Sequence, residues 1–397
     1  MPKIEKRIIS AISNHLLSIC VAMVTIVTLY VRFCFRDFIT MDMRIYLLEW
    51  FKQISNEGGM HALKQRIGDY NIVYQTIIAL FTYLPVKPEY MYKGLSVLFD
   101  YLLAWSAAQI VFALSKNKVF QVITYCAMVS LPFVVLNSAA WGQCDSIYVF
   151  FCILSILMLI REKHFLSLLA YAVAFAFKLQ AIFLMPLFLL AWFKGNFSIL
   201  CFLLIPCVNI LLSLPALFAG QSIASVLSVY LDQTGTYAKI ACNYPSIWLL
   251  MQNNLNESYY SVTAPLAIAT TILVLLFLIV LIIYKTSTIS GLECVKLAFI
   301  ISFTCVLFIP AMHERYSYLY MIIGMVLAVL DNTTIPAYLC LICIDLQGYG
   351  NYLFQLDVLS WKTLAFLNVM VYVYYVCHLM SPYLRQVRGL SIRSEDN

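Results

Sequence analysis

The chain has 397 residues, of which 63% are hydrophobic and only 11% are charged, and its mean hydropathy is +0.88. A soluble domain usually carries about a quarter charged residues, so this composition excludes the soluble classes and predicts an integral membrane protein. The net charge of +6 is spread over the loops without a basic block, which argues against a nucleic acid partner.

Apolar runs long enough to cross a bilayer recur from end to end. They predict an all-α polytopic membrane protein in which residues 1–397 form a single integral membrane domain with about 12 transmembrane helices. We place the spans at 12–35, 90–114, 119–137, 146–160, 165–177, 181–193, 198–219, 262–284, 296–310, 316–330, 336–347 and 362–381. Connections that carry Lys and Arg are expected in the cytoplasm, together with both termini and a tail at 382–397.

Two large extracytoplasmic loops are expected, at 37–89 and 220–261. In the first loop, apolar residues at helical spacing predict an amphipathic helix on the membrane surface, ended by Gly58-Gly59; they are Ile45, Leu48, Phe51 and Ile54. The apolar segment 71–84 is only about 14 residues long, so we expect a re-entrant or interfacial piece rather than a span.

Three polar stretches fall at the outer ends of predicted spans, and we expect them to form one site. They are Thr40-Met-Asp-Met-Arg-Ile-Tyr46, Trp141-Gly-Gln-Cys-Asp145 and Met312-His-Glu-Arg-Tyr316. A partly desolvated carboxylate such as Asp42 can take a proton from an attacking hydroxyl, although a helix cap or membrane anchor is the alternative. Successive ionisable residues at a membrane are costly unless they face a cavity, and a solvated interfacial cluster is the alternative for the third stretch.

Trp141 and Gln143 suit a sugar, which needs an apolar surface for stacking and amides for its hydroxyls. Alternatively, Trp141 is an interfacial anchor and Asp145 caps the next span. Arg315 suits a phosphate because its planar fork pairs bidentately, and His313 could bind the same phosphate.

Other polar residues interrupt apolar sequence. Lys178, followed by Gln180, either snorkels to the surface or supplies a second cation for a lipid phosphate. For Asp100, inside the second span, we expect hydrogen bonding between helices. The cysteines lie mostly in apolar runs and are interpreted as small apolar residues. No cofactor is indicated, although Asp42 with Asp145 could hold a divalent metal.

Five stretches carry a resemblance that extends to about residue 320. They are Asp42-Met-Arg-Ile-Tyr-Leu-Leu-Glu-Trp50, Gly68-Asp-Tyr-Asn71, Trp141-Gly-Gln-Cys-Asp145, Phe177-Lys-Leu-Gln180 and His313-Glu-Arg-Tyr316. Together they resemble the bacterial membrane proteins related to the GPI mannosyltransferases, within the polyprenyl-phosphate-dependent glycosyltransferases of the C superfamily (GT-C). The chain departs from that family in lacking the usual proline after the Asp-Tyr pair.

The resemblance implies a GT-C-type fold and an inverting transfer of a hexose, mannose or another, from a polyprenyl-phosphate carrier to an extracytoplasmic glycan or glycolipid. It implies that Asp42 is the catalytic base and that the donor phosphate is bound by Arg315, His313 and Lys178. It assigns sugar or acceptor binding to Trp141, Gln143, Asp145, Arg44, Asp69, Tyr70, Glu314 and Tyr316. The isoprenoid tail would lie in the bilayer, in a groove between spans. A lipid-sugar flippase or transporter and a polysaccharide polymerase are the alternatives.

Overall fold

The computed structural model describes residues 3–234, 239–251, 260–285 and 288–393. Helices dominate this part of the chain, and its only regular strands are β1 (Ala241–Cys242) and β2 (Met312–His313). Within it, five helices are long and apolar enough to cross a membrane, and a bent helix pair at 118–141 makes up to six. The predicted all-α architecture is confirmed, and these helices agree with a membrane protein.

The helices fall into three groups by length. The longest are α1 (Lys3–Cys34), α4 (Pro88–Ser115), α13 (Tyr260–Lys285), α14 (Gly291–Phe308), α16 (Ile335–Phe354) and α17 (Trp361–Arg393). Shorter helices are α2 (Leu48–Asn56), α3 (Ile72–Phe81), α5 (Lys118–Ser130), α6 (Pro132–Val135), α7 (Asp145–Ile160), α8 (His164–Phe177), α9 (Met185–Phe193), α10 (Leu204–Leu212), α11 (Leu214–Phe218), α12 (Ile223–Thr234) and α15 (Tyr318–Leu330). Short 3-10 or π-helical segments are η1 (Met43–Leu47), η2 (Gly59–Lys64), η3 (Leu136–Trp141), η4 (Leu179–Leu184), η5 (Ile199–Leu203), η6 (Ile247–Leu250), η8 (Glu314–Ser317) and η9 (Asn332–Thr334).

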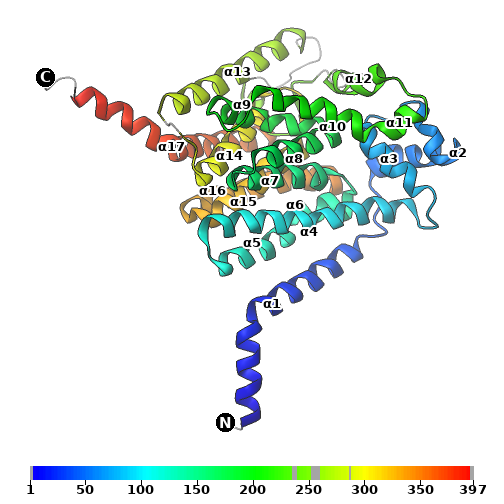
Figure 1. Ribbon diagram of the computed structural model, residues 1–397, viewed down its shortest axis with the longest axis horizontal. Helices are drawn as coiled ribbons and strands as arrows, with labels where there is room; N and C mark the ends of the chain where they lie inside the picture. The colour runs from blue at the N-terminus through cyan, green and yellow to red at the C-terminus, as the bar shows by residue number, and fades with distance from the viewer. Residues whose placement is uncertain (1–2, 235–238, 252–259, 286–287, 394–397) are drawn as a thin grey trace.

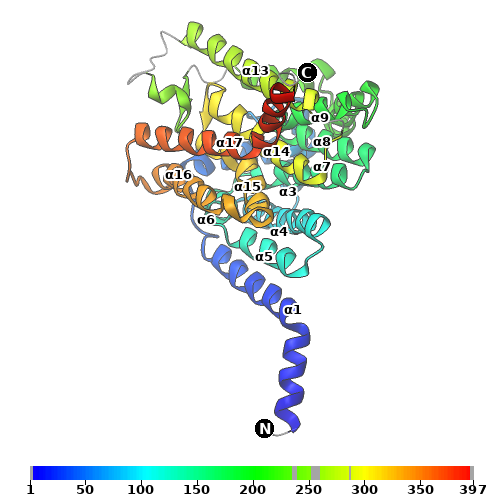
Figure 2. The ribbon, with the colours of Figure 1, turned by 90° about the vertical axis from the view of Figure 1, so that its left-hand side faces the viewer.

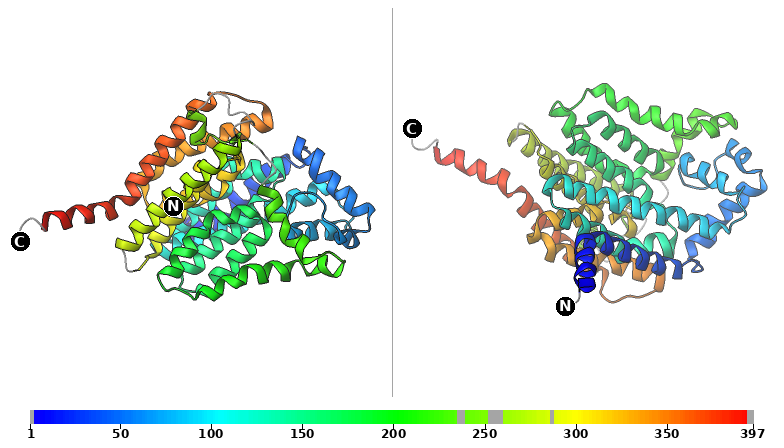
Figure 3. Two further views of the ribbon diagram at one scale, coloured as in Figure 1. Left: turned by 90° about the horizontal axis from the view of Figure 1, so that it is seen from above. Right: turned by 60° about the horizontal axis from the view of Figure 1, so that its bottom comes forward.

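The core of the bundle is formed by α4, α5, α7 and α8, with α14 and α15 packed beside them (Figure 1). Small residues on α4, such as Ala104 and Ala107, are fully buried and let neighbouring helices approach closely. The N-terminal part of α1 projects away from the bundle (Figure 2). The short helices α2 and α3 gather with α11 and α12 at one end, away from the C-terminal end of α17 (Figures 1 and 3).

Two predicted spans are interrupted. The span expected at 119–137 breaks at Pro132, where the chain bends by 51°, because proline lacks the N–H that would continue the helical hydrogen bonding. The span expected at 198–219 divides at Ser213, just before Pro215, into α10 and α11. Neither proline had been used in placing the spans.

Three other helix boundaries differ from the prediction: α16 and α17 end later than expected, and α14 begins earlier. α16 continues to Phe354, so residues 348–354 are helical rather than part of an outer loop. α17 continues to Arg393, so most of the expected tail at 382–397 is helical, and 394–397 lie outside the described residues. α14 begins at Gly291 after a capping box of Ser290 and Glu293, which places Lys296 inside a helix and not in a loop.

Residues 37–89, expected as the first extracytoplasmic loop, contain several short helices. A helix is present at 43–56, but Ile45 is 49% exposed, while Leu47 and Ile54 are buried. The apolar face is shifted because η1 is π-helical, with i→i+5 bonds, and does not follow the expected α-helical spacing. α3 has 10 residues and is about 15 Å long, too short for a hydrocarbon core of about 30 Å. Of the second loop, 235–238 and 252–259 lie outside the described residues.

Candidate functional site

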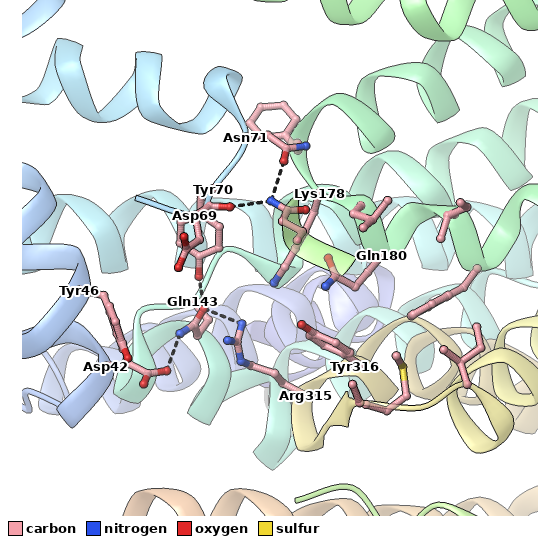
Figure 4. A pocket seen from close by; sticks show the side chains of 18 of the residues that line it. Asp42, Tyr46, Asp69, Tyr70, Asn71, Gln143, Lys178, Gln180, Arg315 and Tyr316 are labelled. Carbon is pink, nitrogen blue, oxygen red and sulfur yellow. Dashed lines mark hydrogen bonds between the residues drawn. The ribbon is translucent and has the colours of Figure 1, made fainter. Parts of the chain in front are cut away.

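The three polar stretches meet around the side-chain amide of Gln143 (Figure 4). Its Oε1 accepts hydrogen bonds from the Tyr70 hydroxyl at 2.7 Å and from Nη1 of Arg315 at 2.9 Å. Its Nε2 donates to Oδ2 of Asp42 at 3.3 Å. Gln143 is almost fully buried, so this amide fixes the positions of Asp42 and Arg315 relative to each other.

Both oxygens of Asp42 accept hydrogen bonds. Oδ2 also accepts from Nε1 of Trp141 at 2.9 Å, and Oδ1 accepts from the Tyr352 hydroxyl. Trp141 has no exposed surface, and its ring stacks on Tyr352 with centroids 4.2 Å apart. Tyr352 covers the ring of Trp141, and the indole N–H orients the carboxylate of Asp42, while sugar stacking on Trp141 stays a prediction.

Close packing of backbone brings the first two stretches together. Asp42 directly precedes the π-helical η1, and Trp141 ends the π-helical η3; such bulges occur frequently at functional sites. Gly142 follows with φ of 73°, and a Cβ there would lie 2.3 Å from Cε of Met43. The left-handed conformation favours glycine here, and any larger residue would also have to displace the end of the Met43 side chain.

A buried ion pair between Arg32 and Asp100 stabilises the position of η3. Nε of Arg32 donates to Oδ2 of Asp100 at 3.0 Å, and the same oxygen accepts from Oγ of Ser138 at 2.5 Å. Nη1 of Arg32 donates to the Val129 carbonyl near the break between α5 and α6 at 3.0 Å. The expected hydrogen bonding between helices at Asp100 is confirmed, and it ties α1 and α4 to the segment that ends in Trp141.

Asp145 holds two cations in place. The carboxylate is fully buried; Oδ1 accepts from Nζ of Lys178, and Oδ2 lies 3.8 Å from Nη1 of Arg315. Oδ2 also accepts from Nδ2 of Asn137 at 3.0 Å. Asp145 does not line the cavity described below and makes no side-chain cap. Its contacts in the structure are with Lys178 and Arg315, which do line the cavity, and its expected contact with a sugar stays a prediction.

The third stretch is held by a two-residue parallel pairing. Met312 pairs with Ala241, and the backbone N–H of Ala311 donates to the Ile240 carbonyl at 3.1 Å. Burial lowers the pKa of His313 to about 4, so the imidazole is neutral at pH 7 and could bind a phosphate only through an N–H donor. Burial raises the pKa of Glu314 to about 7, and this side chain also lies outside the cavity lining.

A cavity of about 580 Å³ opens beside this cluster. Its polar lining comprises Asp42, Asp69, Asn71, Gln143, Lys178, Gln180, Gln233 and Arg315. Its apolar lining comprises Leu47, Phe177, Leu179, Ile182, Phe183, Ile268, Ile309, Pro310, Ala311 and Met312, and its tyrosine and tryptophan residues are Tyr46, Trp50, Tyr70, Tyr260 and Tyr316. The labelled polar side chains gather on one side, and carbon-rich side chains continue beyond Gln180 and Tyr316 (Figure 4). The cavity is thus suited to a ligand with a charged head and an apolar part.

The structure brings seven predicted site residues to this cavity: Asp42, Asp69, Tyr70, Gln143, Lys178, Arg315 and Tyr316. Arg44 is exposed and is not brought to the cavity lining. The sequence-based list missed Tyr46, Trp50, Asn71, Gln180, Gln233, Asn137 and Tyr352. Amides within apolar sequence, as at Asn137 and Gln180, were the available signal.

Two of these amides, Gln233 and Gln180, contribute to the site in different ways. Nε2 of Gln233, on α12, donates to the Asp69 carbonyl at 2.6 Å and to Oδ1 of Asn71 at 3.0 Å, which ties α12 to the segment before α3. Oε1 of Gln180 is buried without a hydrogen-bond partner among the described residues, so it can accept from a ligand hydroxyl.

The chemistry of the donor set does not favour a metal between Asp42 and Asp145. Their oxygens face hydrogen-bond donors and cations of the protein. Within the described ranges, no group of three or more His, Cys, Asp and Glu side chains lies close enough to hold an ion.

Comparison with protein-family models finds no match for this chain, and comparison with curated proteins finds none either. The cavity itself combines a fixed carboxylate, Asp42, and two cations, Lys178 and Arg315, with an apolar trough.

Proposed function

We propose that the protein is an inverting glycosyltransferase that moves a hexose from a polyprenyl-phosphate carrier to an acceptor hydroxyl. One observation carries the proposal: Asp42 and the cations Lys178 and Arg315 line the same cavity, which also has an apolar side. A carboxylate provides a base, the cations suit a phosphate, and the apolar side suits an isoprenoid chain.

In the proposed reaction, the acceptor oxygen attacks the anomeric carbon and its proton passes to Asp42. The bond from that carbon to the phosphate oxygen breaks, and the electron pair leaves with polyprenyl phosphate, whose negative charge increases by one. Lys178 and Arg315 stabilise this developing charge, because electrostatic stabilisation acts most strongly in a partly desolvated site. Inversion requires the base and the leaving group on opposite faces of the sugar, with Gln143 between Asp42 and Arg315 in contact with both.

The apolar trough runs between η4, residues 309–312 and the start of α13. We propose that the isoprenoid tail lies there and reaches the bilayer along α13, whose lipid-compatible surface includes Leu266, Leu273 and Phe277 at 59%, 67% and 65% exposure. In this proposal, the shorter apolar helices complete about 12 spans of a GT-C-type fold. Both termini lie in the cytoplasm, and the cavity lies on the extracytoplasmic side of the cell membrane.

The proposal is tested by incubating membranes that contain the protein with a panel of polyprenyl-phosphate sugars. We expect one donor to be consumed by wild-type membranes, with the sugar transferred to an endogenous glycan or glycolipid, and not by membranes with Asp42→Asn. Equal consumption of every donor by both membranes would contradict the proposal. So would labelling that reaches the cavity from both sides of the membrane, since this is the behaviour of a transporter.

A further inference from the structure

Trp50 belongs to two neighbouring cavities. It lines the cavity that contains Asp42, and it also lines a second hollow of about 340 Å³ along α2. The other side chains of this second hollow are Glu49, Lys52, Gln53, Asn56 and Glu57. The two cavities are therefore neighbours that share Trp50 in their linings.

The lining of the second hollow selects a class of ligand. Apart from Trp50, every side chain in it is polar, which disfavours a lipid tail. The hollow carries a net negative charge, because the ammonium of Lys52 is outnumbered by the carboxylates of Glu49 and Glu57. This charge disfavours phosphates and other polyanions. Amides and carboxylates around an aromatic ring suit a neutral polyol, since its hydroxyls need donors and acceptors while its C–H surface packs on the ring.

The hollow is held in shape before any ligand arrives. Gly68, with φ of 71°, packs against the indole, and a Cβ there would lie 2.4 Å from Cε2 of Trp50. Tyr70 packs edge-on against the same ring at 5.4 Å between centroids. Glu57 accepts from Nε2 of Gln53 at 3.0 Å and from Nε2 of Gln65 at 2.7 Å. Such preorganisation reduces the entropy lost on binding.

The length of the hollow points to more than one sugar. Trp50 lies near the start of α2, and Glu57 directly follows its last residue. The seven residues between these positions correspond to about 10 Å along a helix axis, which exceeds the length of one sugar ring. We propose that the acceptor is a neutral oligosaccharide, with its terminal sugar beside Asp42 and its preceding sugars along α2 over Trp50. The inference rests on the proposed function and names the acceptor class of that same site.

The test measures binding by the full chain in lipid nanodiscs without donor. The probes are neutral oligosaccharides of one to four sugars in α-mannose, β-glucose and N-acetylglucosamine series, titrated separately. We expect affinity in one series to rise with length up to three sugars and Trp50→Ala to lower trisaccharide affinity by about tenfold or more, as for a buried tryptophan contact. Trp192→Ala is the matched control, because Trp192 on α9 is 37% exposed and lines neither cavity.

A second variant keeps the test decisive if the Trp50→Ala protein misfolds. The side chains of Gln53 and Asn56 are exposed, so Gln53→Ala with Asn56→Ala should fold normally and still lose the gain from the second and third sugars. Affinity that is independent of length, equal affinities of the Trp50 and Trp192 variants, or binding of no probe would each overturn the inference. Donor consumption, measured separately, tests the proposed function, so either can fail alone.

Discussion

The substitution Asp42→Asn distinguishes the chemical role of the carboxylate from its structural role. The amide oxygen can keep the hydrogen bonds from Trp141 and Gln143, and the NH₂ group can donate to the Tyr352 hydroxyl, which turns to accept. Since every partner keeps a hydrogen bond, we expect the free energy of unfolding to change by less than about 1 kcal/mol. The amide cannot take up the proton, so transfer should fall by about 10²- to 10⁴-fold, the usual contribution of a general base.

The assay compares initial transfer rates of purified wild type and Asp42→Asn in nanodiscs, with thermal unfolding recorded on the same samples. Tyr352→Phe is the matched control, because it removes one hydrogen bond to the carboxylate and keeps the base; its rate should lie between the two. An Asp42→Asn enzyme that folds normally and retains more than about a tenth of the wild-type rate would refute the assignment of Asp42 as the base.

Three further predictions concern the cations and the buried acid. Arg315→Ala should raise the KM for the donor by about tenfold or more, since a charged hydrogen bond is lost; unchanged donor affinity would remove its phosphate role. Lys178→Met should lower the free energy of unfolding by about 3–5 kcal/mol, because Asp145 stays buried with its main partner gone; adding Asp145→Asn should recover part of this loss in thermal unfolding, and strictly additive losses would contradict the pairing. The pKa of Glu314 is raised from 4.5 to about 7, so the native state holds more protons in this range and stability should fall as pH rises through it. The pKa of His313 is lowered from 6.5 to about 4, which gives the opposite slope between these values. Glu314→Gln should therefore make stability fall less steeply between about pH 4.5 and 7 than in the wild type, and an unchanged slope would contradict this.

The sequence by itself determined the class of the protein and most of the charged residues of the cavity. Hydropathy is a local property, so it identified helical, membrane-compatible segments without knowledge of their packing. Asp42, Lys178 and Arg315 could be selected because an ionisable side chain beside a membrane is costly unless something binds it. The same cost explains why Asp100 could be expected to hydrogen-bond between helices, although its partner Arg32 could not be named.

Tertiary packing decided which side chains touch and which are buried. Tyr352 lies 310 positions from Asp42 in the chain, and its hydroxyl donates to that carboxylate. Its ring also covers Trp141, for which the sequence alone suggested stacking with a sugar. The pKa of His313 is lowered chiefly by burial, which depends on the packed fold, and further by the nearby positive charge of Arg315. Trp50 lines two cavities, and its ring is held in place by Gly68 and Tyr70, which follow it by about 20 positions in the chain. Composition and spacing report what one segment can do, whereas burial and hydrogen-bond partners depend on distant segments that meet only in the fold.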